Sequence, residues 1–134
     1  GKKSSPPRKT TTRSKPAEEK ALSSKQLADL ICKGAEKKHA EEIEVIDVRK
    51  TSSVCNYLVV CTAQSAPQLP AIADGIDEAL SKKGVKIPRI QGKHGSNWLI
   101  IDFVNVVVHI MGKEERKKYN LEDLWGKSGI IYHV

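Results

Sequence analysis

The feature that most constrains this chain is the segment from Gly95 to Met111, which contains two apolar, β-branched runs. The runs cover residues 97–103 and 106–111, and only Val104 and Asn105 separate them. Two strands joined by two residues predict a tight antiparallel hairpin. Because directly opposite residues of a hairpin point to the same side of the sheet, this loop length also predicts which residues share a face.

The two predicted faces of the hairpin differ in their chemistry. The first face is wholly apolar and pairs Phe103 with Val106, Ile101 with Val108, and Leu99 with Ile110. The second face carries Trp98, Ile100, Asp102, Val107, His109 and Met111. A carboxylate and an imidazole are uncommon in a core, so the second face is either half covered by the fold or offered to a partner.

The net charge of +7 belongs mainly to the first part of the chain. Residues 1–25 carry +6, so the other 109 of the 134 residues carry only +1. Residues 1–23 are rich in Lys, Ser, Thr and Pro and show no apolar periodicity, which predicts a disordered basic tail. This tail is either simply solvated or an arm that contacts rRNA with salt-sensitive affinity.

Cysteine use and hydropathy define the class of protein. Cys32, Cys55 and Cys61 include no Cys-x-x-Cys pair, which favours free thiols in a reducing compartment over disulfides or a zinc site. We expect no metal and no other cofactor. No apolar run approaches the length of a bilayer crossing, so we expect no membrane segment. We expect a cytoplasmic protein, with a chloroplast stroma or mitochondrial matrix as the alternative because the start is rich in Arg, Ser and Thr.

The middle of the chain predicts an α/β domain. Helical spacing covers residues 24–39, strand-like runs follow at 43–48 and 54–62, and a second helix begins near Pro67 and ends before Gly84. Residues 85–90 form a short strand that Pro88 restricts to a sheet edge. The hairpin follows, and a final helical turn starts at Asn120. The fold class is α/β, with a mixed sheet of about five strands flanked by helices. The folded domain covers residues 24–126, and residues 127–134 form a C-terminal extension without an assigned role.

Catalytic chemistry has little support in the sequence. A Gly-Ser pair before Asp102 resembles nucleotidyltransferases, which hold Mg²⁺ between two carboxylates in a D-x-D arrangement. Position 104 is Val, however, and no other acidic strand supplies the second carboxylate. His109 has no nucleophile beside it and is better interpreted as hydrogen-bonded within the structure. Cys61 lacks a partner base. We therefore expect a protein that is not an enzyme.

Trp98 has two interpretations that the residues alone leave open. A buried tryptophan is the ordinary case, but aromatic side chains also anchor protein interfaces. Its predicted face includes Asp102, which is costly to bury without a partner.

A succession of short motifs resembles one known family. The motifs are Asp47-Val48, Asn56–Thr62, Ile72–Asp74, Trp98–Asp102, Val106–His109, Glu115-Arg116, Tyr119 and Leu121–Trp125. Over about residues 24–126, this succession is similar to the ribosomal silencing factor family RsfS, also called Iojap.

The resemblance implies a fold similar to nucleotidyltransferases without their catalytic carboxylates. It also implies a homodimer that binds ribosomal protein number fourteen of the large ribosomal subunit, sterically blocks joining of the small subunit and so represses translation. Carried over to this chain, the partner-binding residues are Trp98, Asp102, Phe103, Val104 and Asn105. The alternative is a degenerate nucleotidyltransferase that acts on a nucleotide or RNA.

The hairpin turn departs from the family pattern. Val104-Asn105 stands where the family often has Gly-Asp. A β-branched residue is unfavourable at positive φ, which leaves the turn type open.

Overall fold

A mixed six-stranded sheet organises the chain. The computed structural model describes residues 22–92, 97–119 and 130–133. The elements within these ranges are, in order, α2 (Ser24–Lys37), β1 (Glu41–Asp47), β2 (Tyr57–Ala63), α3 (Gln68–Ser81), β3 (Ile90–Gly92), β4 (Trp98–Asp102), β5 (Val106–Gly112), α4 (Lys113–Tyr119) and β6 (Ile130–His133).

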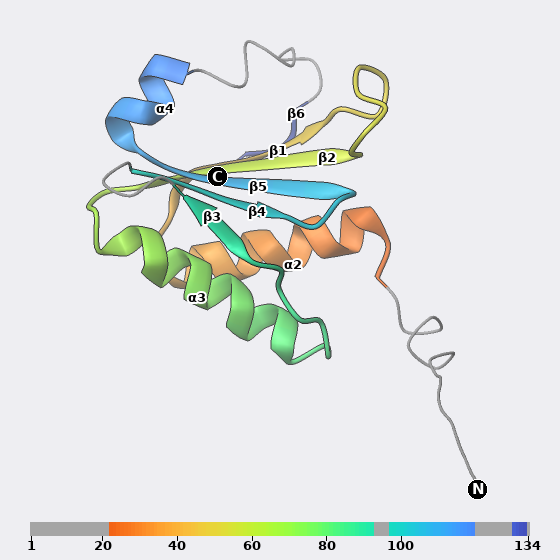
Figure 1. Ribbon diagram of the computed structural model, residues 1–134, viewed down its shortest axis with the longest axis horizontal. Coiled ribbons are helices and arrows are strands. Elements are labelled where there is room, and N and C mark those ends of the chain that lie inside the picture. The colour runs from red at the N-terminus through yellow and green to blue at the C-terminus, as the bar shows by residue number, and fades with distance from the viewer. Residues whose placement is uncertain (1–21, 93–96, 120–129, 134) are drawn as a thin grey trace, which may run out of the picture.

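The strands follow the order β3-β4-β5-β2-β1-β6 across the sheet. β2 and β5 pair in parallel at the centre, and every other neighbouring pair is antiparallel. Helices α2 and α3 cover one face of the sheet, whereas α4 lies on the opposite face (Figure 1). We call these the helix face and the α4 face. The α/β class with a mixed sheet is confirmed.

The start of α2 is fixed by a reciprocal capping arrangement. The Gln26 backbone N–H donates to Ser23 Oγ at 3.1 Å, and the Ser23 N–H donates to Gln26 Oε1 at 2.9 Å. Such a capping box satisfies two backbone donors that a helix start would otherwise leave without partners. Further along the helix, Gly34 allows very close approach of α3. A Cβ on Gly34 would lie only 2.6 Å from the carbonyl oxygen of Gly75, so the two helices cross with their backbones in contact.

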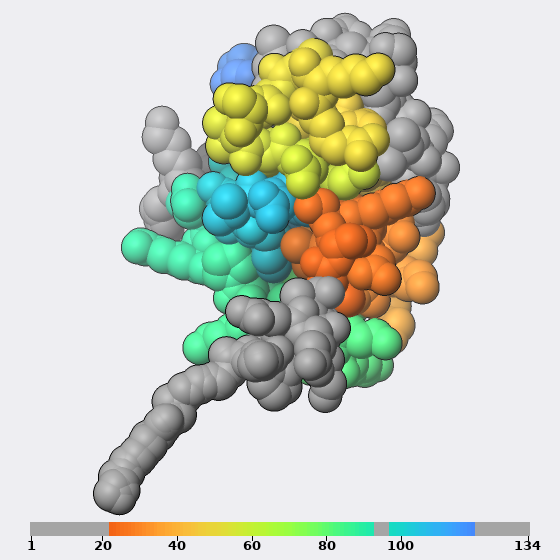
Figure 2. Space-filling view, turned by 90° about the vertical axis from the view of Figure 1, so that its right-hand side faces the viewer, coloured from red at the N-terminus to blue at the C-terminus, as the bar shows by residue number. Residues whose placement is uncertain are grey.

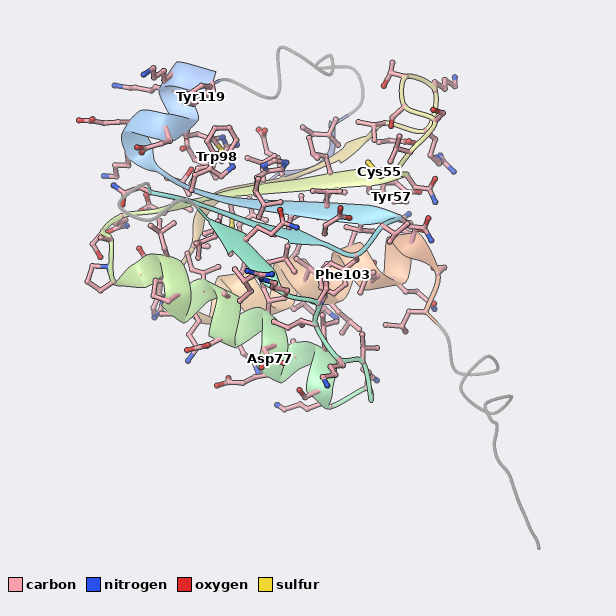
Figure 3. The ribbon with its side chains drawn as sticks, in the orientation of Figure 1. Cys55, Tyr57, Asp77, Trp98, Phe103 and Tyr119 are labelled. Atoms are coloured by element: carbon pink, nitrogen blue, oxygen red, sulfur yellow. The ribbon has the colours of Figure 1, made fainter. Side chains whose placement is uncertain are left out.

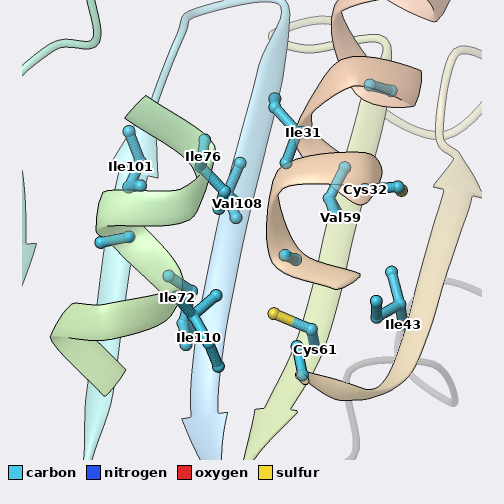
Figure 4. Close-up of a cluster of buried hydrophobic side chains, with 14 of the residues drawn as sticks. Ile31, Cys32, Ile43, Val59, Cys61, Ile72, Ile76, Ile101, Val108 and Ile110 are labelled. Atoms are coloured by element: carbon cyan, nitrogen blue, oxygen red, sulfur yellow. The ribbon is translucent and has the colours of Figure 1, made fainter. Parts of the chain in front are cut away.

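The helix face holds the main hydrophobic core (Figure 4). The stripe predicted for the second helix, Leu69, Ile72, Ile76 and Leu80, is fully buried against the sheet. All seven residues of β2 are buried, as expected of a central strand covered on both faces. The three cysteines are free and buried, in agreement with the sequence prediction.

The hairpin has the predicted register. Ile101 pairs with Val108, and Leu99 pairs with Ile110. At the turn, the Phe103 N–H donates to the Val106 carbonyl oxygen at 2.8 Å. The apolar face of this hairpin packs against α2 and α3, and the mixed face points toward α4.

The structure differs from the sequence prediction in three elements. The edge strand β3 occupies residues 90–92 rather than 85–90, because the chain enters regular pairing only after Pro88. Residues 113–119, predicted only as a charged segment, form α4. Residues 130–133, assigned to an extension without a role, form the sixth strand and pair with β1. Residues 1–21 of the predicted tail, which covers 1–23, and the predicted turn at Asn120 lie outside the described residues.

None of the described helices has the length and apolar character needed to cross a bilayer.

Candidate functional site

Trp98 begins β4 and stands on the α4 face of the sheet. It is half-buried and packs against a small buried cluster that includes Leu58, Val60 and Met111. Its indole Nε1–H donates to His109 Nδ1 across the hairpin at 2.9 Å. The cross-strand bond holds the indole plane in place, so Trp98 is a fixed rather than a loose aromatic group.

His109 has the structural role that the sequence favoured. Burial lowers the pKa of its imidazole from 6.5 to about 4, so the ring is neutral at physiological pH. Nδ1 accepts the bond from Trp98, which places the ring proton on Nε2. In this arrangement the neutral imidazole accepts the indole N–H and orients the tryptophan.

Helix α4 is attached to the sheet through Arg116. The guanidinium is only 7% exposed and donates to the Glu42 carbonyl oxygen at 2.8 Å and to Thr62 Oγ1 at 2.9 Å. It also forms an ion pair with Glu44 at 3.1 Å. Charge-assisted bonds of this kind fix direction as well as distance. They therefore set where α4 lies and where its last residue, Tyr119, can reach.

A groove lies between α4 and the outer strands. The rings of Trp98 and Tyr119 are 4.8 Å apart, and Tyr119 is 46% exposed. Both side chains stand on the α4 side of the sheet (Figure 3). The groove has a volume of about 670 Å³ and is lined by Gln91, Gly92, Trp98, Ile100, Glu114, Glu115, Lys118 and Tyr119. It combines an aromatic wall with charged side chains at its rim.

The hairpin turn forms a second feature at the far end of β4. Val104 has φ +76° and is 66% exposed. A β-branched residue in this region is strained, and the strain persists only where neighbouring contacts hold the turn. The Val104 N–H donates to Asp102 Oδ1 at 2.7 Å, and the Asn105 carbonyl accepts from the Asn56 N–H at 2.7 Å. The turn is therefore held on both sides.

The five predicted partner-binding residues fall into two groups. Trp98 lies at one end of β4, and the turn group, Asp102 to Asn105, begins at the other end, about 13 Å away after four residue rises. Phe103 packs against the core on the helix face, opposite to Trp98 (Figure 3). Figure 2 shows the end of the molecule where the turn, in cyan, lies beside the start of α2, in orange. The structure thus brings together the turn group but separates it from Trp98.

Sequence reasoning missed Tyr119 and Arg116 as members of the site. Both residues belong to the motifs that carried the family resemblance, but α4 has no apolar stripe that would reveal a helix. Their roles depend on contacts with distant strands. Their presence in the family motifs was the signal that could have identified them as members of the site.

Cys61 is unsuited to nucleophilic chemistry at neutral pH. It is fully buried, and burial raises the pKa of its thiol to about 12. Asp102, the carboxylate compared above with the D-x-D pattern, accepts a hydrogen bond from the Val104 backbone N–H. Within residues 22–92, 97–119 and 130–133, no group of three or more His, Cys, Asp or Glu side chains is placed to hold a metal ion.

Comparison with known proteins gives a consistent result. The family described as "Ribosomal silencing factor during starvation" matches residues 21–132 of this chain. The chain belongs to the ribosomal silencing factor family. The RsfS protein of Halalkalibacterium halodurans is 32% identical over 110 residues, which cover 82% of this chain and 94% of that relative. The chloroplastic Iojap protein of Arabidopsis thaliana is 33% identical over 66% of this chain and 37% of its own length.

The fold agrees with this membership. A crystal structure of a Chromobacterium violaceum protein superposes with a TM-score of 0.72 at 29% identity and covers 78% of this chain and 88% of that one. The silencing factor match extends to residue 132, so it includes most of β6. The family resemblance read from the sequence motifs is confirmed.

Proposed function

We propose that this silencing factor represses translation by occupying the large ribosomal subunit. In this proposal it binds ribosomal protein number fourteen of that subunit and physically obstructs the small subunit. Repression then requires no turnover, only a stable complex. The likeness of the fold to nucleotidyltransferases without their catalytic carboxylates belongs to the same proposal.

The observation that carries the proposal is the fixed, half-exposed indole of Trp98 in the groove under α4. Its orientation is set by the bond to His109, and one of its flanks is covered by Tyr119. A rigid aromatic group loses little conformational entropy when it binds, and tryptophan is enriched among the residues that dominate interface energies. We therefore assign Trp98 as the main anchor for the ribosomal protein.

We assign the turn group, Asp102, Phe103, Val104 and Asn105, to the margin of the same interface. A standard interface buries about 800 Å² on each partner, which is wide enough to extend along the whole of β4. Val104 presents an exposed apolar side chain there. Phe103 is partly buried in the core, so it supports the turn more than it contacts the partner.

The decisive experiment replaces Trp98. Trp98→Glu places a charge in the groove and should weaken co-sedimentation with purified large subunits by at least about 30-fold, which corresponds to a hot-spot loss of about 2 kcal/mol. In a sucrose-gradient assay, the wild-type protein should reduce the fraction of joined ribosomes when small subunits are added. The variant should not.

Two controls separate binding from folding. Lys33→Gln makes the same charge change of −1 at an exposed position of α2, far from the groove, and should bind as wild type. Circular dichroism should show that Trp98→Glu keeps its secondary structure. Unchanged binding by a folded Trp98→Glu protein would remove Trp98 from the interface.

Three further assignments belong to this proposal. We propose that the basic tail adds a secondary contact with rRNA, since residues 1–25 carry a net charge of +6. We also propose a homodimer. Relatives from bacteria and from a chloroplast both match, so the proposed activity fits either the cytoplasm or an organelle.

A further inference from the structure

Strand β3 forms one outer edge of the sheet. Among the strands that the structure describes, it pairs only with β4, and its three residues are all exposed. Edge strands carry backbone N–H and C=O groups without sheet partners, and natural proteins usually protect them with charges, proline or a covering element. In β3, Pro88 lies two residues before the strand and removes no donor from it.

The directions of the free backbone groups follow from the hairpin register. The Phe103 N–H donates to the Val106 carbonyl oxygen, and the Gly112 N–H donates to the Asn97 carbonyl oxygen. The backbone N–H and C=O groups of the odd-numbered residues of β4 therefore point toward β5. Alternation along an antiparallel strand then turns the backbone of Ile100 toward β3, where it lies opposite Gln91. The two other residues of β3, Ile90 and Gly92, consequently direct their N–H and C=O groups outward.

The groove under α4 opens next to this edge. Gln91 lies directly opposite Ile100, so both side chains are on the α4 face, and both line the groove with Trp98 and Tyr119. A strand added beside β3 would direct every second side chain toward this same face. Backbone pairing and an aromatic groove thus occur together, as in domains that bind peptides by strand addition.

The charge of the groove indicates the kind of segment that fits. Glu114 is exposed and Glu115 is half-buried, and neither forms an ion pair within the described residues. The Lys118 ammonium lies over the Tyr119 ring at 5.5 Å from its centre. Among the described lining residues, two carboxylates against one ammonium give an acidic rim, which favours a cationic side chain in the occupant.

We propose that the free edge of β3 takes up an extended, cation-bearing segment of the ribosomal protein partner as an additional strand. Main-chain bonds to Ile90 and Gly92 hold the segment, one of its apolar or aromatic side chains enters the groove beside Trp98, and a Lys or Arg meets the acidic rim. This inference rests on the proposed function for the identity of the partner. It adds the mode of docking.

The experiment separates backbone pairing from side-chain contact. Ile90→Pro removes one outward N–H but leaves the Gln91 pairing with β4 intact, and proline is tolerated at edge positions of this kind. Ile90→Ala keeps the N–H and removes most of the side chain. With purified large subunits as the probe, we expect Ile90→Pro to bind at least tenfold more weakly and Ile90→Ala to stay within threefold of wild type.

The outcomes distinguish this inference from the proposed function. Wild-type affinity in Ile90→Pro, or equal losses in Ile90→Pro and Ile90→Ala, would overturn strand addition, whereas loss of binding in Trp98→Glu would still support the proposed function. Wild-type affinity in a folded Trp98→Glu protein combined with a loss in Ile90→Pro alone would leave strand addition standing and remove Trp98 as the anchor.

A second measurement covers the case in which Ile90→Pro does not fold. Hydrogen exchange on the full wild-type chain should show the amides of Ile90 and Gly92 gaining protection when large subunits are added. Unchanged exchange at both amides would overturn the inference. Protection that appears without subunits and grows with protein concentration would identify a second copy of this chain as the occupant, which also overturns it.

Discussion

The two faces of the sheet are built by different kinds of interaction. On the helix face, aliphatic side chains from α2, α3 and the strands interdigitate, and the backbones of Gly34 and Gly75 touch. On the α4 face, a smaller apolar cluster is bordered by polar groups whose bonds have defined directions, chiefly Trp98 with His109 and Arg116 with Glu44.

This difference separates stability from recognition. Apolar packing is strong, but it offers no directional contacts to a binding partner. Hydrogen bonds, in contrast, can hold an aromatic group partly exposed in one orientation. The helix face therefore supplies most of the stability of the domain. The α4 face carries the groove and the anchor that we assign to the ribosomal partner.

The largest effect is expected from a cavity on the helix face. Ile76 is fully buried between α3 and the sheet. Ile76→Ala should lower the free energy of unfolding by about 4 kcal/mol, and Ile76→Val, as a matched control, by about 1 kcal/mol. Urea unfolding followed by circular dichroism measures both. A loss below about 1 kcal/mol in Ile76→Ala would show that the helix face is not the main source of stability.

The next effect concerns the buried ion pair of the α4 face. Arg116→Met should cost about 3 kcal/mol, because Glu44, Thr62 and the Glu42 carbonyl all lose the hydrogen bond that Arg116 donates. The double variant Arg116→Met/Glu44→Leu should recover much of that loss, since a matched apolar pair avoids burying a charge. If the double variant unfolds as easily as the single one, the pair does more than neutralise a buried carboxylate.

We expect the single and double variants to differ from wild type in binding as well. Neither variant keeps the bonds that direct α4, so Tyr119 should no longer be held against Trp98. Binding to large subunits should therefore weaken even in the double variant, in which stability recovers. Recovery of both properties together would show that α4 needs only apolar packing.

The smallest effect is a pH dependence caused by His109. Its folded pKa of about 4 lies below the ordinary value of 6.5, so between these two pH values the unfolded chain binds more protons than the folded one. Stability is therefore fully present above pH 6.5 and is lost as the pH falls toward 4. The shift corresponds to at most about 3 kcal/mol, and partial exposure of the ring reduces the expected change to about 2 kcal/mol.

The matched variant for this effect is His109→Gln, which offers Trp98 an acceptor that does not titrate. The free energy of unfolding should be measured at pH 7 and pH 4.5 for both proteins. The wild-type protein should lose more stability than the variant on acidification. Equal losses would assign the pH dependence to other groups.

The sequence predicted the fold where local pattern and tertiary structure agree. The hairpin register followed from alternation and a two-residue loop, and the stripe from Leu69 to Leu80 followed from helical spacing. Helix α4 could not be predicted in this way, because it is placed by the bonds of Arg116 to residues more than fifty positions earlier. The role of β6 likewise depends on its pairing with β1, which no local signal encodes.

The candidate site was only partly accessible from the sequence. Alternation already placed Trp98 and Phe103 on opposite faces, yet the family motif grouped them into one contact surface. The structure shows their separation along β4 and brings Tyr119 to Trp98 instead. A motif records which residues matter, whereas the distance between them depends on how the strands and helices are placed.

The parallel pairing of β2 with β5 has a consequence for synthesis on the ribosome. A nascent chain emerges from its N-terminus, so β2 and both long helices appear well before β5 is available. During that interval, β2 offers a seven-residue apolar strand with one open side, which is the kind of segment that aggregates or recruits a chaperone. Only when Val106 to Gly112 have been added does that side close, and the half-built sheet then becomes a stable domain.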